Sequence, residues 1–252
     1  MFAQHRISIS ALGLTIIFGL LFGANYYLYP ETVSVPRLQI SPDSLKIPPE
    51  ITHGDRTKQQ VIFTFDGGSD AQSGDAILAT LKKHGVKGTF FLTGKFVLHN
   101  QALVKRIAAE GHEIFNHSYD HPHFTDISTT EMVGQLRHMN TILRMTISSS
   151  TVPYFRPPYG ARDERVLKAA ATAGYQSVYW TVDARDWMAG EDGKATGAIS
   201  DDEVRDRILS NVSPGAIYLM HLGDPITGRI LDDVFTTIEN RGYKMVSLTQ
   251  GI

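Results

Sequence analysis

The sequence contains two histidines four residues apart, His117 and His121, whose type and spacing could support chemistry. Two imidazoles at this spacing can bind one metal ion, although such a pair taken alone is more often part of a surface or a core. Two groups that could exchange protons, Asp66 and His221, lie far away along the chain. The sequence therefore allows a metal-assisted acid–base site if the fold brings these four residues together.

The elements that must position these residues form a repeating pattern. From Gln60 onward, short apolar runs alternate with helical patterns, which indicates strand–helix units and a parallel sheet. We expect strands near Val61–Phe65, Thr89–Leu92, Glu113–Phe115, Tyr154–Arg156, Ser177–Val182, Ala216–Met220 and Lys244–Val246. Helix stops are indicated by Gly85, Gly111, Gly174 and Gly242, and helix starts by the capping-box pairs Ser128/Glu131 and Ser200/Glu203.

This alternation predicts an α/β fold, an irregular (β/α) barrel of about seven strands. A doubly wound or two-layer sheet is the alternative. In a (β/α) barrel, catalytic side chains collect at the carboxyl ends of the strands. Five of the expected strands end at or just before residues that could do chemistry, which are Asp66, His117 with His121, Arg156, Asp183 with Asp186, and His221. We expect these side chains to meet.

Composition limits the classes of function. Lys and Arg number 24 against 26 Asp and Glu, for a formal charge of −2, so no broad field favours nucleic acid as a partner. The chain has no cysteine, which excludes disulfides, a cysteine nucleophile and thiolate metal sites. Any metal must bind His, Asp or Glu.

The N-terminus predicts membrane attachment. Residues Ile7–Tyr29 contain no charge and are long enough to cross a bilayer as a helix, with Arg6 before them. We expect residues 1–29 to be a short cytoplasmic tail plus a transmembrane helix, residues 30–57, with five prolines, to be a tether, and residues 58–252 to be an extracytoplasmic catalytic domain. A secreted protein released by signal cleavage is the alternative.

The ordered set of polar residues resembles the polysaccharide deacetylase family, also called carbohydrate esterase family 4 or the NodB-homology domain. The resemblance runs from about Gln60 to the C-terminus. It rests on five motifs, Thr64-Phe65-Asp66-Gly67-Gly68, His117-Ser118-Tyr119-Asp120-His121, Arg156-Pro157-Pro158-Tyr159, Asp183-Ala184-Arg185-Asp186-Trp187 and Leu219-Met220-His221. It implies a hydrolase that removes N-acetyl groups from amino-sugar glycans such as peptidoglycan or chitin.

The resemblance also implies a metal and a base. His117 and His121 would hold a divalent cation, commonly zinc in the family, which acidifies a bound water and polarises the acetyl carbonyl. Asp66 would accept the proton of the water. Arg156 would pair with Asp66 and orient it.

The remaining motif residues would complete the site. The backbone N–H of Tyr159 would stabilise the oxyanion, and His221 would protonate the departing amine. Asp183 would hold the ring of His221. Trp187 and Leu219 would wall the pocket.

One position departs from the family pattern. The family usually has a second Asp directly after the base, as a third metal ligand, and this chain has Gly67 there. Two imidazoles alone bind a divalent cation more weakly than two imidazoles together with a carboxylate. A nearby oxygen ligand such as Asp70 could substitute, the metal could be weakly held or approached by Asp66, or the activity could be lost or altered.

Two other functions compete with deacetylation. Gly67 motivates a glycan-binding pseudo-enzyme with a degraded metal site. A glycoside hydrolase would use two carboxylates, for which Asp66 and Asp183 are candidates, but this leaves the histidine pair and Arg156 without a role. The sequence does not choose between chitin-like glycans and the sugars of peptidoglycan.

Overall fold

A parallel sheet of short strands forms the centre of the computed structural model, which describes residues 46–68, 70–189 and 198–252. The strands follow the order β5-β4-β3-β2-β1-β7-β6, and β8 also pairs with β1. Their bounds are β1 Gln60–Gly67, β2 Thr89–Leu92, β3 Glu113–Asn116, β4 Tyr154–Phe155, β5 Gln176–Ser177, β6 Val182–Asp183, β7 Ile217–His221 and β8 Lys244–Val246. All the carboxyl ends of this sheet therefore lie at one edge.

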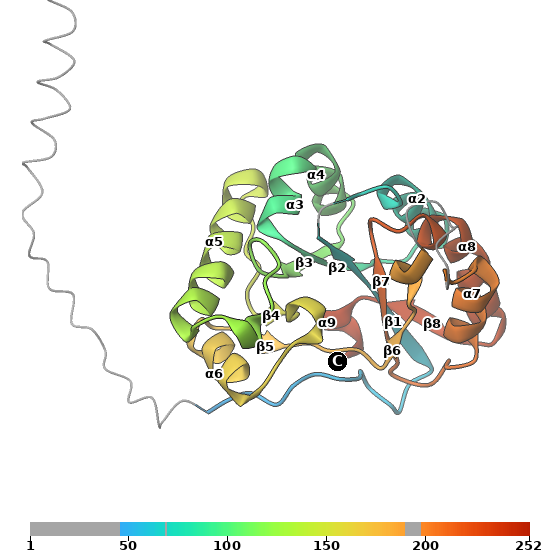
Figure 1. The fold of residues 1–252 in the computed structure, drawn as a ribbon. Coiled ribbons are helices and arrows are strands. Elements are labelled where there is room, and N and C mark those ends of the chain that lie inside the picture. Colours follow the sequence, from blue (N-terminus) through green and yellow to red (C-terminus); the bar gives the residue numbers. More distant parts are fainter. Residues whose placement is uncertain (1–45, 69, 190–197) are drawn as a thin grey trace, which may run out of the picture. The chain divides into compact units, whose positions relative to one another are not determined.

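Helices follow the strands and pack around them, as Figure 1 shows. They are α2 Gly74–Lys83, α3 Gly94–His99, α4 Gln101–Ala109, α5 Thr129–Ile147, α6 Glu164–Thr172, α7 Asp201–Leu209, α8 Pro225–Asn240 and α9 Leu248–Gly251. The predicted capping boxes at Ser128 and Ser200 are confirmed at the starts of α5 and α7. Gly85, Gly111, Gly174 and Gly242 all have positive φ, as helix stops require.

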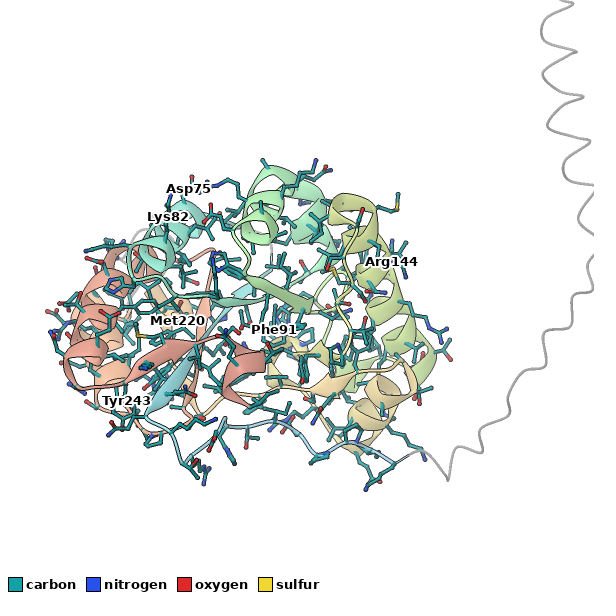
Figure 2. All side chains as sticks on the ribbon, turned by 180° about the vertical axis from the view of Figure 1, so that it is seen from behind. Asp75, Lys82, Phe91, Arg144, Met220 and Tyr243 are labelled. Carbon is teal, nitrogen blue, oxygen red and sulfur yellow. The ribbon has the colours of Figure 1, made fainter. Side chains whose placement is uncertain are left out.

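Strand alternation separates two layers of the core. On β1, Phe63 and Phe65 face a large cluster shared with the helices, whereas Ile62 faces a smaller cluster inside the curved sheet. Phe91 and Met220 are both labelled in Figure 2. Phe91 belongs to the smaller cluster inside the curved sheet, and Met220 belongs to the large cluster shared with the helices. Because side chains alternate along a strand, Asp66 shares the inner face with Ile62. This register directs the carboxylate toward the interior of the sheet.

The expected strand Ser177–Val182 is wrong as one element. The structure has two short strands there, β5 and β6, at opposite ends of the sheet order, joined by residues 178–181. The amide of Val178 bonds Phe155 O at 2.9 Å, and that of Thr181 bonds Ile217 O at 2.8 Å. The segment thus pairs first with β4 and then with β7. One continuous strand could not pair with both, because they lie on different sides of the sheet order.

Residues 46–57, assigned to the tether from sequence, lie against the domain. Ile51 forms a parallel bridge with Val178, and its carbonyl accepts a 2.7 Å bond from the amide of Tyr179. Gly54 donates to Gly215 O at 2.7 Å and Asp55 to Gly251 O at 2.6 Å. The folded unit therefore begins before Lys58.

The expected anchor, Ile7–Tyr29, and residues 30–45 of the tether lie outside the described residues. Within residues 46–68, 70–189 and 198–252, no helix has both the length and the apolar character that a bilayer span requires.

Candidate active site

A cavity of about 450 Å³ opens at the carboxyl ends of the strands. Its lining includes eight residues singled out from the sequence, Asp66, His117, His121, Tyr159, Asp183, Trp187, Leu219 and His221. Pro157, Gly160 and Trp180 also line it. Trp180 was not predicted from the sequence, although an aromatic residue three positions before Asp183, in an apolar run, was an available signal. The cavity lies within the range of small-ligand sites.

The candidate base is held by a buried guanidinium. Arg156, with no exposed surface, donates from Nη1 to Asp66 Oδ1 at 2.7 Å and to Thr64 Oγ1 at 2.8 Å. Its Cζ lies 4.2 Å from the centroid of the Phe91 ring. The ion pair offsets the cost of burying both charges and fixes the orientation of the carboxylate. The second oxygen of Asp66, Oδ2, lies 3.5 Å from His117 Nε2 and so faces the histidine pair. The predicted pairing of Arg156 with Asp66 is confirmed.

The two predicted metal ligands face each other. His117 Nε2 lies 3.1 Å from His121 Nε2, and His117 Nδ1 lies 2.9 Å from Arg156 O. Since a carbonyl only accepts, Nδ1 carries the proton and Nε2 of His117 presents a lone pair. Burial lowers the pKa of His117, and burial together with His117 lowers the pKa of His121 to about 3. Both rings are therefore neutral near pH 7, which is the form that binds metals.

Side-chain acceptors hold the loop that carries this pair. Ser118 and His121 have φ of 73° and 67°, values that non-glycine residues adopt only when their surroundings enforce them. Asn116 Oδ1 accepts from the amide of Ser118 at 2.9 Å, and Ser118 Oγ accepts from the amide of His121 at 3.0 Å. Gln135 Oε1 of α5 accepts from the amide of Tyr119 at 2.9 Å. Asn116 and Gln135 were not predicted, because no local pattern marks an acceptor for a distant loop.

Among the described residues, no third His, Asp or Glu forms a compact three-ligand cluster with this pair. A Cβ on Gly67 would lie 2.7 Å from Leu92 Cδ2 and 2.9 Å from Leu222 Cδ1, so leucine methyl groups fill the space beside that glycine. Asp70, the suggested substitute, instead accepts from the amides of Ala71 and Gln72 and packs near Gly223. The donor set fits a divalent cation through two imidazoles, with Asp66 Oδ2 as the nearest carboxylate oxygen.

The candidate acid is His221, and its partner is Asp186. His221 Nδ1 lies 2.8 Å from Asp186 Oδ1, and the amide of His221 donates to Asp186 Oδ2 at 2.7 Å. The hydroxyl of Thr227 on α8 also donates to Asp186 Oδ2. Burial alone would lower the pKa of His221, but the charge and hydrogen bond of Asp186, with Asp66 and Asp224, raise it to about 9. His221 is therefore protonated at neutral pH, as an acid requires.

The assignment of the ring-holding carboxylate to Asp183 is thus corrected to Asp186. Asp183 lines the same cavity, but its Oδ1 accepts from the amide of Arg185 at 2.8 Å. Among the described residues, the one cluster with three ligand atoms within 4.8 Å of one another is Asp186, His221 and Asp224. In this cluster Asp186 already accepts a hydrogen bond from the ring of His221. We therefore interpret the cluster as the surroundings of the proposed acid and not as a metal site.

Aromatic side chains border the opening of the cavity. Tyr159 is 61% exposed and Trp187 54% exposed, whereas Leu219 is buried. Tyr159 has φ of 57° and stacks on His123 with ring centroids 3.9 Å apart. Large exposed aromatic residues beside a cavity are typical of ligand sites. Trp187 and Leu219, expected to wall the pocket, line the cavity, as does Tyr159, whose backbone N–H was expected to stabilise the oxyanion.

Comparisons with known proteins point to one family. A family model described as Polysaccharide deacetylase matches residues 53–178. The peptidoglycan-N-acetylmuramic acid deacetylase PdaA of Bacillus subtilis is 36% identical over 194 residues, 76% of this chain and 71% of that protein. The peptidoglycan-N-acetylglucosamine deacetylase PgdA of Listeria monocytogenes is 35% identical over 210 residues, 83% of this chain and 42% of that protein. This chain therefore spans less than half of the Listeria enzyme.

Solved structures agree in fold. The structure of Bacillus subtilis PdaA, a family 4 carbohydrate esterase, superposes with a TM-score of 0.73 at 33% identity, covering 80% of this chain and 83% of that one. A wild-type CE4 family pseudoenzyme from Bacillus anthracis also gives 0.73 at 32% identity, covering 81% and 68%. The set of similar structures thus includes a protein described as a pseudoenzyme as well as enzymes.

Proposed function

Because this chain belongs to the polysaccharide deacetylase family, we propose that it removes N-acetyl groups from an amino-sugar glycan, with Asp66 as base and His221 as acid. Members of this family are hydrolases that act on carbon–nitrogen bonds other than peptide bonds. One observation carries the proposal. Asp66, held by the buried Arg156, and the protonated His221, held by Asp186, line the same cavity as two neutral imidazoles.

Each step uses a group already held in place. Asp66 accepts a proton from water as the water oxygen attacks the acetyl carbon. Arg156 keeps the carboxylate oriented through its 2.7 Å bond to Oδ1. The backbone N–H of Tyr159 donates to the developing oxyanion. His221 gives its proton to the amide nitrogen as the carbon–nitrogen bond breaks, which leaves acetate and a free sugar amine.

The metal belongs to the proposal as well. A divalent cation, zinc by analogy with the family, would be held by His117 and His121 and would supply positive charge that acidifies water and polarises the carbonyl. Support comes from two neutral imidazoles, His117 buried and His121 half-buried, whose Nε2 atoms face each other. Gly67 leaves the site without the usual carboxylate, so we expect weaker metal binding than in relatives with that ligand.

The substrate class follows the names of similar proteins. These relatives are named as deacetylases of peptidoglycan N-acetylmuramic acid, of peptidoglycan N-acetylglucosamine and, in Sinorhizobium fredii, of chitooligosaccharide. Their common element is an N-acetylated hexosamine in a glycan chain. We also propose that Ile7–Tyr29 anchors the chain in the cell membrane with the catalytic domain outside, where such glycans lie.

A second candidate function is glycan binding without turnover. Gly67 and the similarity to a CE4 family pseudoenzyme favour it. In that case glycan would bind equally well to the parent, to Asp66→Ala and to His221→Ala, and none of them would release acetate.

Acetate release from the full-length chain in detergent tests the proposal. The substrates are N-acetylglucosamine oligomers and peptidoglycan, offered after chelation and after addition of zinc or another divalent ion. We expect metal-dependent release that falls by roughly 100-fold or more in Asp66→Asn and His221→Gln. Asp126→Asn and His99→Gln, exposed residues that do not line the cavity, serve as matched controls. A folded protein that releases no acetate with any metal would overturn the proposal.

A further inference from the structure

Asp183 is a carboxylate in the cavity that the acid does not use. Asp186 makes both bonds to His221, through Oδ1 to the ring and Oδ2 to the backbone amide, and Thr227 occupies Oδ2 as well. Asp186 thus holds the ring without a second carboxylate. Asp183 lines the cavity and does not contact His221 in the part of the chain that the structure describes, so its carboxylate can serve a ligand.

The backbone of Asp183 is firmly positioned. It ends β6 and lies opposite Leu219 of β7 in the parallel ladder. Its carbonyl accepts a 2.6 Å bond from Arg207 Nε, and its Oδ1 accepts the amide of Arg185, which has φ of 63°. The carboxylate is therefore fixed before any ligand arrives, which reduces the entropy lost on binding.

Asp183 also forms no ion pair with a basic side chain of the described residues. In the part of the chain that the structure describes, no Lys, Arg or His nitrogen lies within 4.0 Å of its carboxylate, and the amide of Arg185 is its one hydrogen-bond donor. A carboxylate offers about four acceptor positions, so most stay open. Trp187 and Leu219 line the same cavity and provide apolar surface for a sugar ring.

We propose that Asp183 accepts hydrogen bonds from sugar hydroxyls and selects a neutral N-acetylhexosamine over one that carries its own carboxylate. The inference rests on the proposed function and narrows its substrate. Hydroxyl-to-carboxylate hydrogen bonds are charge-assisted and strong. A sugar with an acidic substituent, as in N-acetylmuramic acid, brings a second negative charge into a partly desolvated cavity, where like charges repel. The favoured unit is therefore of the N-acetylglucosamine type.

The test compares two glycans and two substitutions in the full-length chain. Acetate release is measured on N-acetylglucosamine tetramers, and on peptidoglycan oligomers in which the only N-acetyl groups lie on muramic acid. We expect Asp183→Ala to raise KM for the neutral tetramer about tenfold, with kcat nearly unchanged, because binding is lost in ground and transition states alike. We expect Asp183→Asn to reduce the preference for the neutral glycan by about tenfold, because the repulsion disappears.

Two controls distinguish binding of the sugar by Asp183 from orientation of His221 by Asp183. Asp126→Asn removes the same charge from an exposed site that does not line the cavity and should leave the preference unchanged. The alkaline limb of the pH–rate profile should stay fixed in both Asp183 variants and move in Asp186→Asn. An alkaline limb that moves in Asp183→Asn, or an unchanged glycan preference, would overturn the inference.

Failure of the proposed function would look different. If the parent releases no acetate, calorimetric binding of the two glycans to the parent and to Asp183→Asn still tests the inference. Equal affinity of the parent for both glycans, or a preference for the acidic one, would contradict it.

Discussion

At the scale of single residues, we expect the His221–Asp186 pair to set the alkaline limit of the proposed reaction. Burial lowers the pKa of His221, but Asp186 and neighbouring carboxylates raise it to about 9. His221 acts as an acid only in its protonated form, so activity should fall as pH rises through about 9. Asp186→Asn removes the largest raising influence and should move this limb down by about 1–2 pH units. The pH dependence of kcat/KM measures the shift, and an unmoved limb would exclude His221–Asp186 as the acid.

We expect the residue at position 67 to determine how strongly the histidine pair binds a metal. Gly67→Asp would add a carboxylate next to Asp66. The atoms in its way are the ends of Leu92 and Leu222, which can rotate, and the edge of the buried Phe96 ring, 3.2 Å from the new Cβ. We expect zinc affinity to rise at least about tenfold, at a stability cost of about 1–3 kcal/mol from overpacking. Calorimetric zinc titration and thermal unfolding measure both effects. Gly68→Asp, at a glycine with open space, is the matched control. An unchanged affinity in Gly67→Asp would show that this position does not face the metal.

Sequence reasoning at this scale located the site but not every contact. The strand ends bring Asp66, His117, His121 and His221 into one cavity, as expected. The sequence could not distinguish Asp183 from Asp186 as the partner of His221, because Asp183 ends the same short strand that Asp186 follows three residues later. Only the turn at Arg185, with its left-handed backbone, decides which carboxylate reaches His221.

At the scale of elements, the turn after β4 positions Tyr159. Gly160 has φ of 66°, and a Cβ there would lie 2.6 Å from Trp180 Cη2. Gly160→Ala should therefore destabilise the domain by about 1–3 kcal/mol and lower kcat by displacing the Tyr159 amide. Gly134→Ala, in open space on α5, should instead stabilise by about 0.5–1 kcal/mol. Chemical denaturation and acetate release test both variants, and equal effects would contradict this account of the turn.

Strand prediction succeeded where local pattern and tertiary pairing agree. Thr89–Leu92 and Lys244–Val246 have the expected bounds. The run Ser177–Val182 has the composition of a strand, but its amides bond Phe155, Ile51 and Ile217 in turn. Those partners come from three distant parts of the chain, so no local pattern could reveal that the run divides.

At the scale of the whole molecule, the segment 46–57 extends the catalytic unit that the sequence placed at 58–252. Four backbone hydrogen bonds join Ile51, Gly54 and Asp55 to the domain. At roughly 0.5–1.5 kcal/mol each, they should make a chain of residues 46–252 about 3 kcal/mol more stable than one of residues 58–252. Urea denaturation of the two chains measures the difference. Equal stability would mean that this segment does not belong to the folded unit.

The position of a bound cation tests the account most directly, because His117 and His121 must share one ion that faces both Asp66 and His221. Anomalous diffraction from zinc-soaked crystals locates that ion. The account predicts one strong peak about 2.0–2.1 Å from both Nε2 atoms. A peak among Asp186, His221 and Asp224 instead, or none at the histidine pair in an intact fold, would contradict it.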